Sequence, residues 1–135
     1  MKLREFMATR IEFIDGDAPV YDAIEKMVDR RIRSLLVEFP GKGLNRGVIT
    51  ARDVIFKVLA KGVDPNQIKV SEIASTPIIC VEPDLDFKQA AVLMEESNIE
   101  RVFVCEAGKI IGVVALLDVM AATLVMRAKE GYASS

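Results

Sequence analysis

Apolar and polar positions recur along this chain with a spacing of 67 residues. A shift of that length places Leu3–Val37 over Val70–Val104 without a gap, and most positions keep their apolar or polar character. Eight aligned pairs are identical, among them Asp17/Asp84 and Met27/Met94. A shift of 65 residues then places Gly47–Val54 over Gly112–Val119, so the first copy has two extra loop residues between Glu38 and Arg46. The pattern indicates an internal duplication.

Each copy predicts the same elements in the same order. A short helical lead-in precedes an extended run, a helix, two strands and a closing helix. In the first copy these are 3–8, 11–14, a helix after Asp17, 34–37, 47–50 and 52–61. In the second they are 70–75, 78–81, a helix after Asp84, 101–104, 112–115 and 118–129. Gly-containing loops at 40–43 and 107–108 connect the paired strands.

The first helix of each copy is predicted to be amphipathic. Asp17 and Asp84 are the expected N-caps, and Pro19 is tolerated in the first turn. The inward faces are expected to carry Val20, Ala23, Ile24, Met27 and Val28 in one copy, and Phe87, Ala90, Ala91, Leu93 and Met94 in the other. A single copy is too short to bury much of a core. We therefore expect an α/β (α+β) fold in which two β-α-β-β-α repeats, 1–66 and 67–135, pack about a pseudo-twofold axis.

Charge and composition exclude several functions. The 18 Lys and Arg against 20 Asp and Glu give a net charge of −2, and the chain has no Trp and only 6% aromatic residues. A nucleic-acid interface is therefore not expected. The absence of His excludes Ser-His-Asp triads and His-ligated metals, and the chain has neither a nucleophile–base pair nor a metal cluster. We expect no metal site, no obligatory cofactor and no enzymatic activity.

Two further features bear on location. Cys80 and Cys105 lie in apolar stretches without metal-ligand spacing, so buried, reduced thiols in a cytoplasmic protein are expected. The run 110–126 holds one charge, Asp118, and is short for a membrane span, which favours a strand followed by a helix over membrane insertion. The N-terminus lacks the apolar segment of a signal peptide.

Both copies share a longer pattern. Gly47-Val48-Ile49-Thr50-Ala51-Arg52-Asp53-Val54, preceded by Asp22-Ala23-Ile24-x-x-Met27 and Leu35-Leu36-Val37, resembles the CBS (cystathionine-β-synthase) domain. The chain as a whole resembles a stand-alone tandem pair of CBS domains, a Bateman module. The resemblance implies two related clefts that bind adenosine-containing ligands. It also implies a protein that regulates an enzyme or transporter.

The resemblance assigns residues to a first cleft. Thr50, Arg52 and Asp53 would contact phosphate and ribose, and the base would lie against Pro77, Ile78 and Ile79, with Ile99 and Arg101 nearby. The chemistry suits these roles, because a carboxylate accepts from both ribose hydroxyls and a helix N-terminus favours an anion.

A second cleft would pair Asp118 with Ile11, Ile32 and Arg33. There Ala115 and Leu117 replace the hydroxyl and the cation, and Glu12 would repel a phosphate. We expect this second site to be weak or empty.

Simpler interpretations remain open. Thr50-x-x-Asp53 also fits a helix capping box, Arg52 a solvated helix charge, and Arg101 a partner for a neighbouring acid. The last helix is apolar nearly all round, which predicts a homodimer formed through the closing helices. A structural dimerisation module with vestigial, ligand-free clefts is the alternative to a nucleotide sensor.

Overall fold

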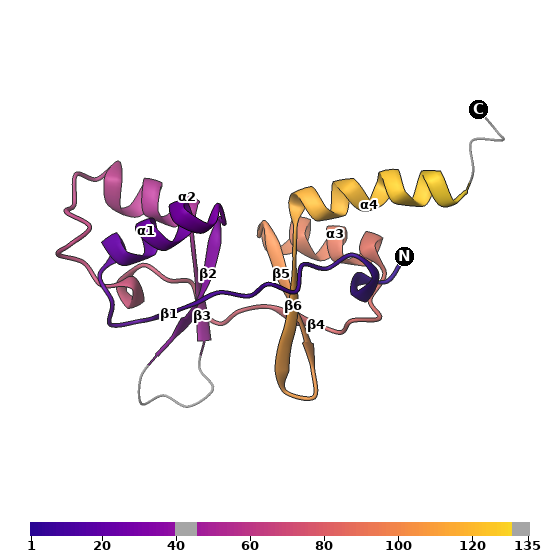
Figure 1. Ribbon diagram of the computed structural model, residues 1–135, viewed down its shortest axis with the longest axis horizontal. Coiled ribbons are helices and arrows are strands. Elements are labelled where there is room, and N and C mark those ends of the chain that lie inside the picture. Colours follow the sequence, from indigo (N-terminus) through magenta and orange to yellow (C-terminus); the bar gives the residue numbers. More distant parts are fainter. Residues whose placement is uncertain (40–45, 131–135) are drawn as a thin grey trace. The chain divides into compact units, whose positions relative to one another are not determined.

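The computed structural model describes residues 1–39 and 46–130, with the predicted element order in both copies (Figure 1). The first copy comprises β1 (Phe13–Asp15), α1 (Val20–Arg30), β2 (Ser34–Glu38), β3 (Arg46–Thr50) and α2 (Ala51–Val54), which continues as a π-helix, η2 (Ile55–Leu59). The second comprises β4 (Cys80–Val81), α3 (Phe87–Ser97), β5 (Arg101–Glu106), β6 (Lys109–Ala115) and α4 (Leu116–Lys129). Both lead-ins are single 3₁₀ turns, Leu3–Glu5 and Val70–Glu72.

The two sheets have the same topology. In each, the middle strand pairs in parallel with the first strand and antiparallel with the third, giving the orders β1-β2-β3 and β4-β5-β6. The β5–β6 turn contains Ala107 and Gly108, both at positive φ as a tight hairpin requires. The loop predicted at 40–43 lies outside the described residues. The expected α+β class and the strand–helix–strand–strand–helix order of both repeats are confirmed.

Each sheet buries one face under its own helices. In the first copy, alternate β2 residues Leu35 and Val37 share a cluster with Val20 and Met27 of α1 and Val58 of η2. In the second, Val102 and Val104 of β5 share a cluster with Phe87, Ala90 and Met94 of α3 and Ala122 of α4. The i, i+2 spacing on the strands places these side chains on one face. Leu36 of β2 and Phe103 of β5, on the opposite face of each sheet, are buried as well.

The compact units of the chain exchange their lead-ins. One unit, here called the central unit, is Glu12–Ile78, and the other, the terminal unit, is Met1–Ile11 together with Ile79–Ser135. Leu3 is fully buried in the terminal cluster, and Ala8 bridges Val113 of β6. Val70 is buried in the central cluster, and Ser75 bridges Val48 of β3. The repeats of the sequence divide at 66/67, whereas the compact units divide at 11/12 and 78/79.

The predicted helix starts are wrong by two residues. Pro19 occupies the N-cap position of α1, and Asp86 caps α3, where its side chain accepts from the backbone N–H of Lys88. Asp84 instead accepts from Nε of Arg4 at 2.8 Å, which draws it away from the helix. The predicted inward face of α1 is too wide, because Val28 is 69% exposed while Val20, Ala23 and Met27 form a narrow buried stripe.

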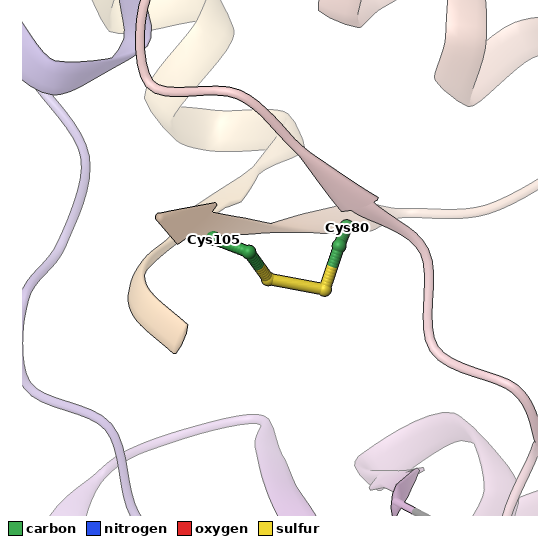
Figure 2. The surroundings of a disulfide bond; sticks show 2 residues. All are labelled: Cys80 and Cys105. Carbon is green, nitrogen blue, oxygen red and sulfur yellow. A yellow bond between two sulfur atoms is a disulfide. The ribbon is translucent and has the colours of Figure 1, made fainter. Parts of the chain in front are cut away.

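The prediction for the cysteines is also wrong. Cys80 on β4 and Cys105 on β5 are joined by a disulfide, with their Cα atoms 5.6 Å apart (Figure 2). Parallel pairing aligns Cys80 with Phe103, two residues from Cys105, so the two side chains come within bonding reach. Cys80 is exposed and Cys105 half-buried. Because disulfides are typical of oxidising compartments, the cysteines no longer support a cytoplasmic location.

The apolar run 110–126 forms all of β6 except its first residue and most of α4, so the expected strand followed by a helix is present. Across 1–39 and 46–130, no helix has the length and apolar character needed to cross a membrane.

Candidate functional site

The turn from β3 to α2 brings together Thr50, Arg52 and Asp53. Thr50 ends the strand in an extended conformation and is the N-cap of the helix. Its side-chain oxygen accepts a hydrogen bond from the backbone N–H of Asp53, and its own backbone N–H donates one to Oδ2 of Asp53. Both donor–acceptor distances are 3.0 Å. These reciprocal bonds form the capping box that the sequence allowed.

Asp53 is the half-buried acid of this turn. Its side chain is 13% exposed, and Oδ1 lies 3.1 Å from Nζ of Lys57, one helical turn later. The same Nζ donates to the carbonyl of Ile73 at 3.0 Å. Lys57 therefore connects the carboxylate at the helix start to the segment that follows the Val70–Glu72 turn.

Arg52 is exposed and its guanidinium lies over the ring of Phe56, 4.7 Å from the centroid. A cation–π contact at an exposed site is worth roughly 0.5–1 kcal/mol. It holds the charge beside the helix start without burying it, so Arg52 keeps the ability to contact a phosphate.

The turn from β6 to α4 repeats this backbone with fewer polar groups. Ala115 is extended like Thr50, and its N–H donates to Oδ2 of Asp118 over 2.8 Å. Having no hydroxyl, Ala115 cannot complete the capping box. Leu117 and Ala122 occupy the positions of Arg52 and Lys57, so the second turn retains the acid and lacks both cations.

The remaining predicted residues are divided between the units. Pro77, Ile78, Ile32 and Arg33 belong to the central unit, and Ile11, Ile79, Ile99 and Arg101 to the terminal unit. The structure brings Thr50, Arg52 and Asp53 together, and places Asp118 in the equivalent turn. The grouping of either turn with residues of the other unit stays a prediction.

Several of these residues have structural contacts inside their own unit. The carbonyl of Arg33 accepts from the N–H of Ala51, and the carbonyl of Ile79 accepts from Phe103. Ile99 packs against the terminal cluster, and Arg101 faces Ala115 across the β5–β6 ladder. Pro77 follows a cis peptide bond and is exposed.

The sequence interpretation missed Lys57. The signal was available, because Asp53 and Lys57 are spaced i, i+4, and such oppositely charged pairs face each other on a helix. Among the described residues, no group of three or more His, Cys, Asp or Glu side chains is placed to hold a metal ion.

Comparison with known proteins identifies the repeat. The family model of the CBS domain matches twice, at residues 3–60 and 70–124. An uncharacterised protein of Methanopyrus kandleri is 37% identical over 115 residues, which cover 82% of this chain and 58% of that protein. A CBS domain-containing protein of Bacillus subtilis, YhcV, is 26% identical over 86% of this chain and 81% of its own length.

A solved structure shows the same fold. A hexameric CBS-CP12 protein from bloom-forming cyanobacteria superposes with a TM-score of 0.84 at 30% identity, covering 89% of this chain and 66% of that one. The chain thus spans little more than half of the Methanopyrus kandleri protein and about two thirds of this structural neighbour.

Proposed function

The chain belongs to the CBS domain family, with two repeats in tandem, and we propose that it binds an adenine nucleotide or related adenosyl compound at the Thr50–Asp53 turn. Proteins made only of CBS domains are generally regulatory rather than catalytic. In this proposal Asp53 accepts from the ribose hydroxyls, while Thr50 and Arg52 contact phosphate. The base lies against Pro77, Ile78 and Ile79, with Ile99 and Arg101 nearby.

The observation that carries the proposal is the environment of Asp53. An ionised carboxylate has about four lone-pair sites, and the contacts with Thr50 and Lys57 occupy only part of them. The remaining capacity suits the two adjacent hydroxyls of a ribose. The cation of Arg52 and the N-terminus of the helix favour an anion at the same turn.

Regulation requires that the ligand favour one conformation of the protein over another. The two units are connected at 11/12 and 78/79, and the second connection directly follows the proposed base contacts Pro77 and Ile78. Binding there would fix the connecting segment and change the surface presented to a partner. We propose an enzyme or transporter as that partner, consistent with the role inferred for the family.

A second function is favoured by two other observations. The capping box at Thr50 and Asp53 is complete without any ligand. In addition, α4 exposes Leu117, Met120 and Leu124, apolar side chains suited to a second copy of the chain. A structural homodimerisation module with empty clefts would have both features. In the sensor proposal the same helices form the homodimer, so ligand binding decides between the two.

Thermal unfolding with AMP, ADP, ATP, S-adenosylmethionine and NADH tests this directly. A ligand at 100 times its dissociation constant should stabilise the protein by about 2.7 kcal/mol. Asp53→Asn, which keeps an oxygen for the cap, should bind roughly ten- to a hundredfold more weakly, because charge-assisted hydrogen bonds are lost. Asp29→Asn, on the exposed part of α1, is the matched control. No stabilisation by any of these compounds would favour the structural module.

A further inference from the structure

The two equivalent turns hold the same acid in opposite electrostatic surroundings. In the central unit, Asp53 is paired with Lys57 at 3.1 Å and is adjacent to Arg52. In the terminal unit, Leu117 and Ala122 replace Arg52 and Lys57, so Asp118 has no cation at either of these two positions. Ala122 is 1% exposed and packs in the terminal cluster.

The residues that hold each helix start extend this contrast. The first helical N–H of the central turn, that of Ala51, donates to the carbonyl of Arg33 over 2.9 Å. The first helical N–H of the terminal turn, that of Leu116, donates to the carbonyl of Glu100 over 3.1 Å. The same backbone position therefore carries a cation in one unit and an anion in the other.

The neighbouring strand residue partly offsets this difference. Across the β-ladder, Ser34 faces Thr50 in the central unit, and Arg101 faces Ala115 in the terminal unit. Arg101 is assigned above to the ligand of the central turn, but even if it is counted with Glu100 and Asp118, the terminal turn keeps one net negative charge. The central turn has two cations, Arg52 and Lys57, against the single acid Asp53, without Arg33, which the sequence assigned to the second cleft. The sign of the local charge thus differs between the two turns even when Arg101 is included.

From this contrast we infer that the two turns differ in the charge of the adenosyl ligand that they accept, with Lys57 as the specificity-determining residue of the central turn. The central turn takes phosphorylated ligands such as AMP or ATP. The Asp118 turn excludes phosphate and accepts an uncharged nucleoside or a cationic adenosyl compound. The inference rests on the proposed function and adds to it which ligand charge each turn tolerates.

The physical basis is the range of charge interactions at a protein surface. At physiological ionic strength the screening length is about 8 Å, so a charge beside the ribose-binding carboxylate is not fully screened from a phosphate on the same nucleoside. Lys57 touches the carboxylate that would hold the ribose, so its charge acts on the phosphate of the same ligand. The binding of an uncharged ribose depends little on that charge. Removal of the Lys57 charge should therefore lower the affinity for AMP and leave the affinity for adenosine nearly unchanged.

Calorimetric titration of adenosine, AMP and ATP tests the role of Lys57. Lys57→Met should lower the affinity for AMP by about tenfold and the affinity for ATP by more, while the affinity for adenosine changes by less than about twofold. Lys57→Arg, which keeps the charge, should restore most of the AMP affinity. Lys61→Met removes an exposed cation four residues further on and is the matched control. Circular dichroism and thermal unfolding of each variant establish that it is folded.

Three outcomes separate the possible roles. Equal losses for adenosine and AMP would overturn the charge inference and leave Lys57 as a residue that merely orients Asp53. Unchanged affinity for AMP would also overturn it, while the proposed function stands. If the unmodified protein binds none of the three compounds, the inference fails, whereas the proposed function fails only if ADP, S-adenosylmethionine and NADH do not bind either.

The Asp118 turn is tested in an Asp53→Asn background. There, residual binding of adenosine or S-adenosylmethionine that disappears on adding Asp118→Asn supports the opposite selectivity. Residual binding of ATP that is tighter than that of adenosine and depends on Asp118 would overturn it. Failure of all these ligands to bind in this background would also overturn the terminal-turn half of the inference.

Discussion

Thr50 and Asp53 exchange two hydrogen bonds of 3.0 Å, each side chain accepting from the backbone N–H of the other residue. The start of α2 is therefore stable before any ligand arrives. A ligand that uses Asp53 shares the carboxylate with the helix cap rather than displacing it. Stability and binding can be separated by changing the two residues differently.

Loss of the Thr50 hydroxyl should destabilise the protein without changing its charge. Thr50→Ala is expected to lower the free energy of unfolding by about 1 kcal/mol, the usual cost of an N-cap. The internal copy offers the reverse change, because Ala115 has a similar extended backbone and lacks only the hydroxyl. Ala115→Thr should raise the free energy of unfolding by about 0.5–1 kcal/mol. Urea denaturation measures both, and a destabilising Ala115→Thr would contradict the equivalence of the two turns.

The disulfide should contribute strongly to stability. Cys80 and Cys105 are 25 residues apart, and closing a loop of that length destabilises the unfolded chain by about 3.5 kcal/mol in the chain-entropy model. The double variant Cys80→Ser/Cys105→Ser should lose that amount in urea denaturation. A reductant should lower the stability of the parent protein and leave the double variant unchanged. Equal stability of the parent with and without reductant would contradict the prediction.

Acid should loosen the N-terminal lead-in. The N-terminal ammonium of Met1 lowers the pKa of Asp86, and Arg4 lowers the pKa of Asp84. The backbone N–H of Lys2 lowers the pKa of Glu5. A depressed pKa in the folded state contributes stability that is present above the ordinary pKa and lost as the pH falls through the folded value. We expect stability to fall as the pH drops below the ordinary values of 4.5 for Glu5 and 3.8 for the two aspartates.

Hydrogen exchange at pH 7 and pH 3 measures this loosening. The N–H of Leu3, which donates to the carbonyl of Leu85, should exchange faster at the lower pH once the intrinsic rate is corrected. Arg4→Met removes the nearer of the two cations paired with Asp84, leaving Lys2 at 3.8 Å, and should weaken the pH dependence. A corrected exchange rate that is the same at both pH values would contradict the prediction.

The exposed face of α4 should mediate self-association. Leu124 is 68% exposed and Val125 is 45% exposed on a helix that presents Leu117 and Met120 as well. Leu124→Arg is expected to shift the protein to monomers in sedimentation analysis at micromolar concentration. Thr123→Arg, at an exposed polar position of the same helix, is the comparison variant. An unmodified protein that is already monomeric under these conditions would contradict the prediction.

The repetition of the sequence was sufficient to predict the order of the elements. Strands such as 34–37 and 101–104 are short apolar runs between a helix and a glycine loop, and the same sequence of patterns occurs in both copies. The capping box was equally readable, because its two residues are three positions apart. Such local patterns need no knowledge of the rest of the fold.

Features that depend on contacts between distant segments were not predicted. Asp84 precedes a helix and resembles an N-cap, but Arg4, 80 residues away, binds it and Asp86 caps the helix instead. The disulfide depends on the parallel register of β4 and β5, which the sequence alone does not define. Lys57 gains its importance from the distance to Asp53 and from the carbonyl of Ile73, and only the i, i+4 spacing was visible beforehand.

The exchange of lead-ins bears on the origin of the duplication. The stretch 1–66 lacks Val70 and Ile73, which the central core buries, whereas 12–78 contains them. The repeat in the sequence thus has different boundaries from the segment that packs as a compact unit. An ancestor with one copy and the same contacts could have filled its core only as a dimer, in which the first residues of each chain packed into the core of the other chain. Gene fusion would then have joined the two subunits of that dimer in one chain.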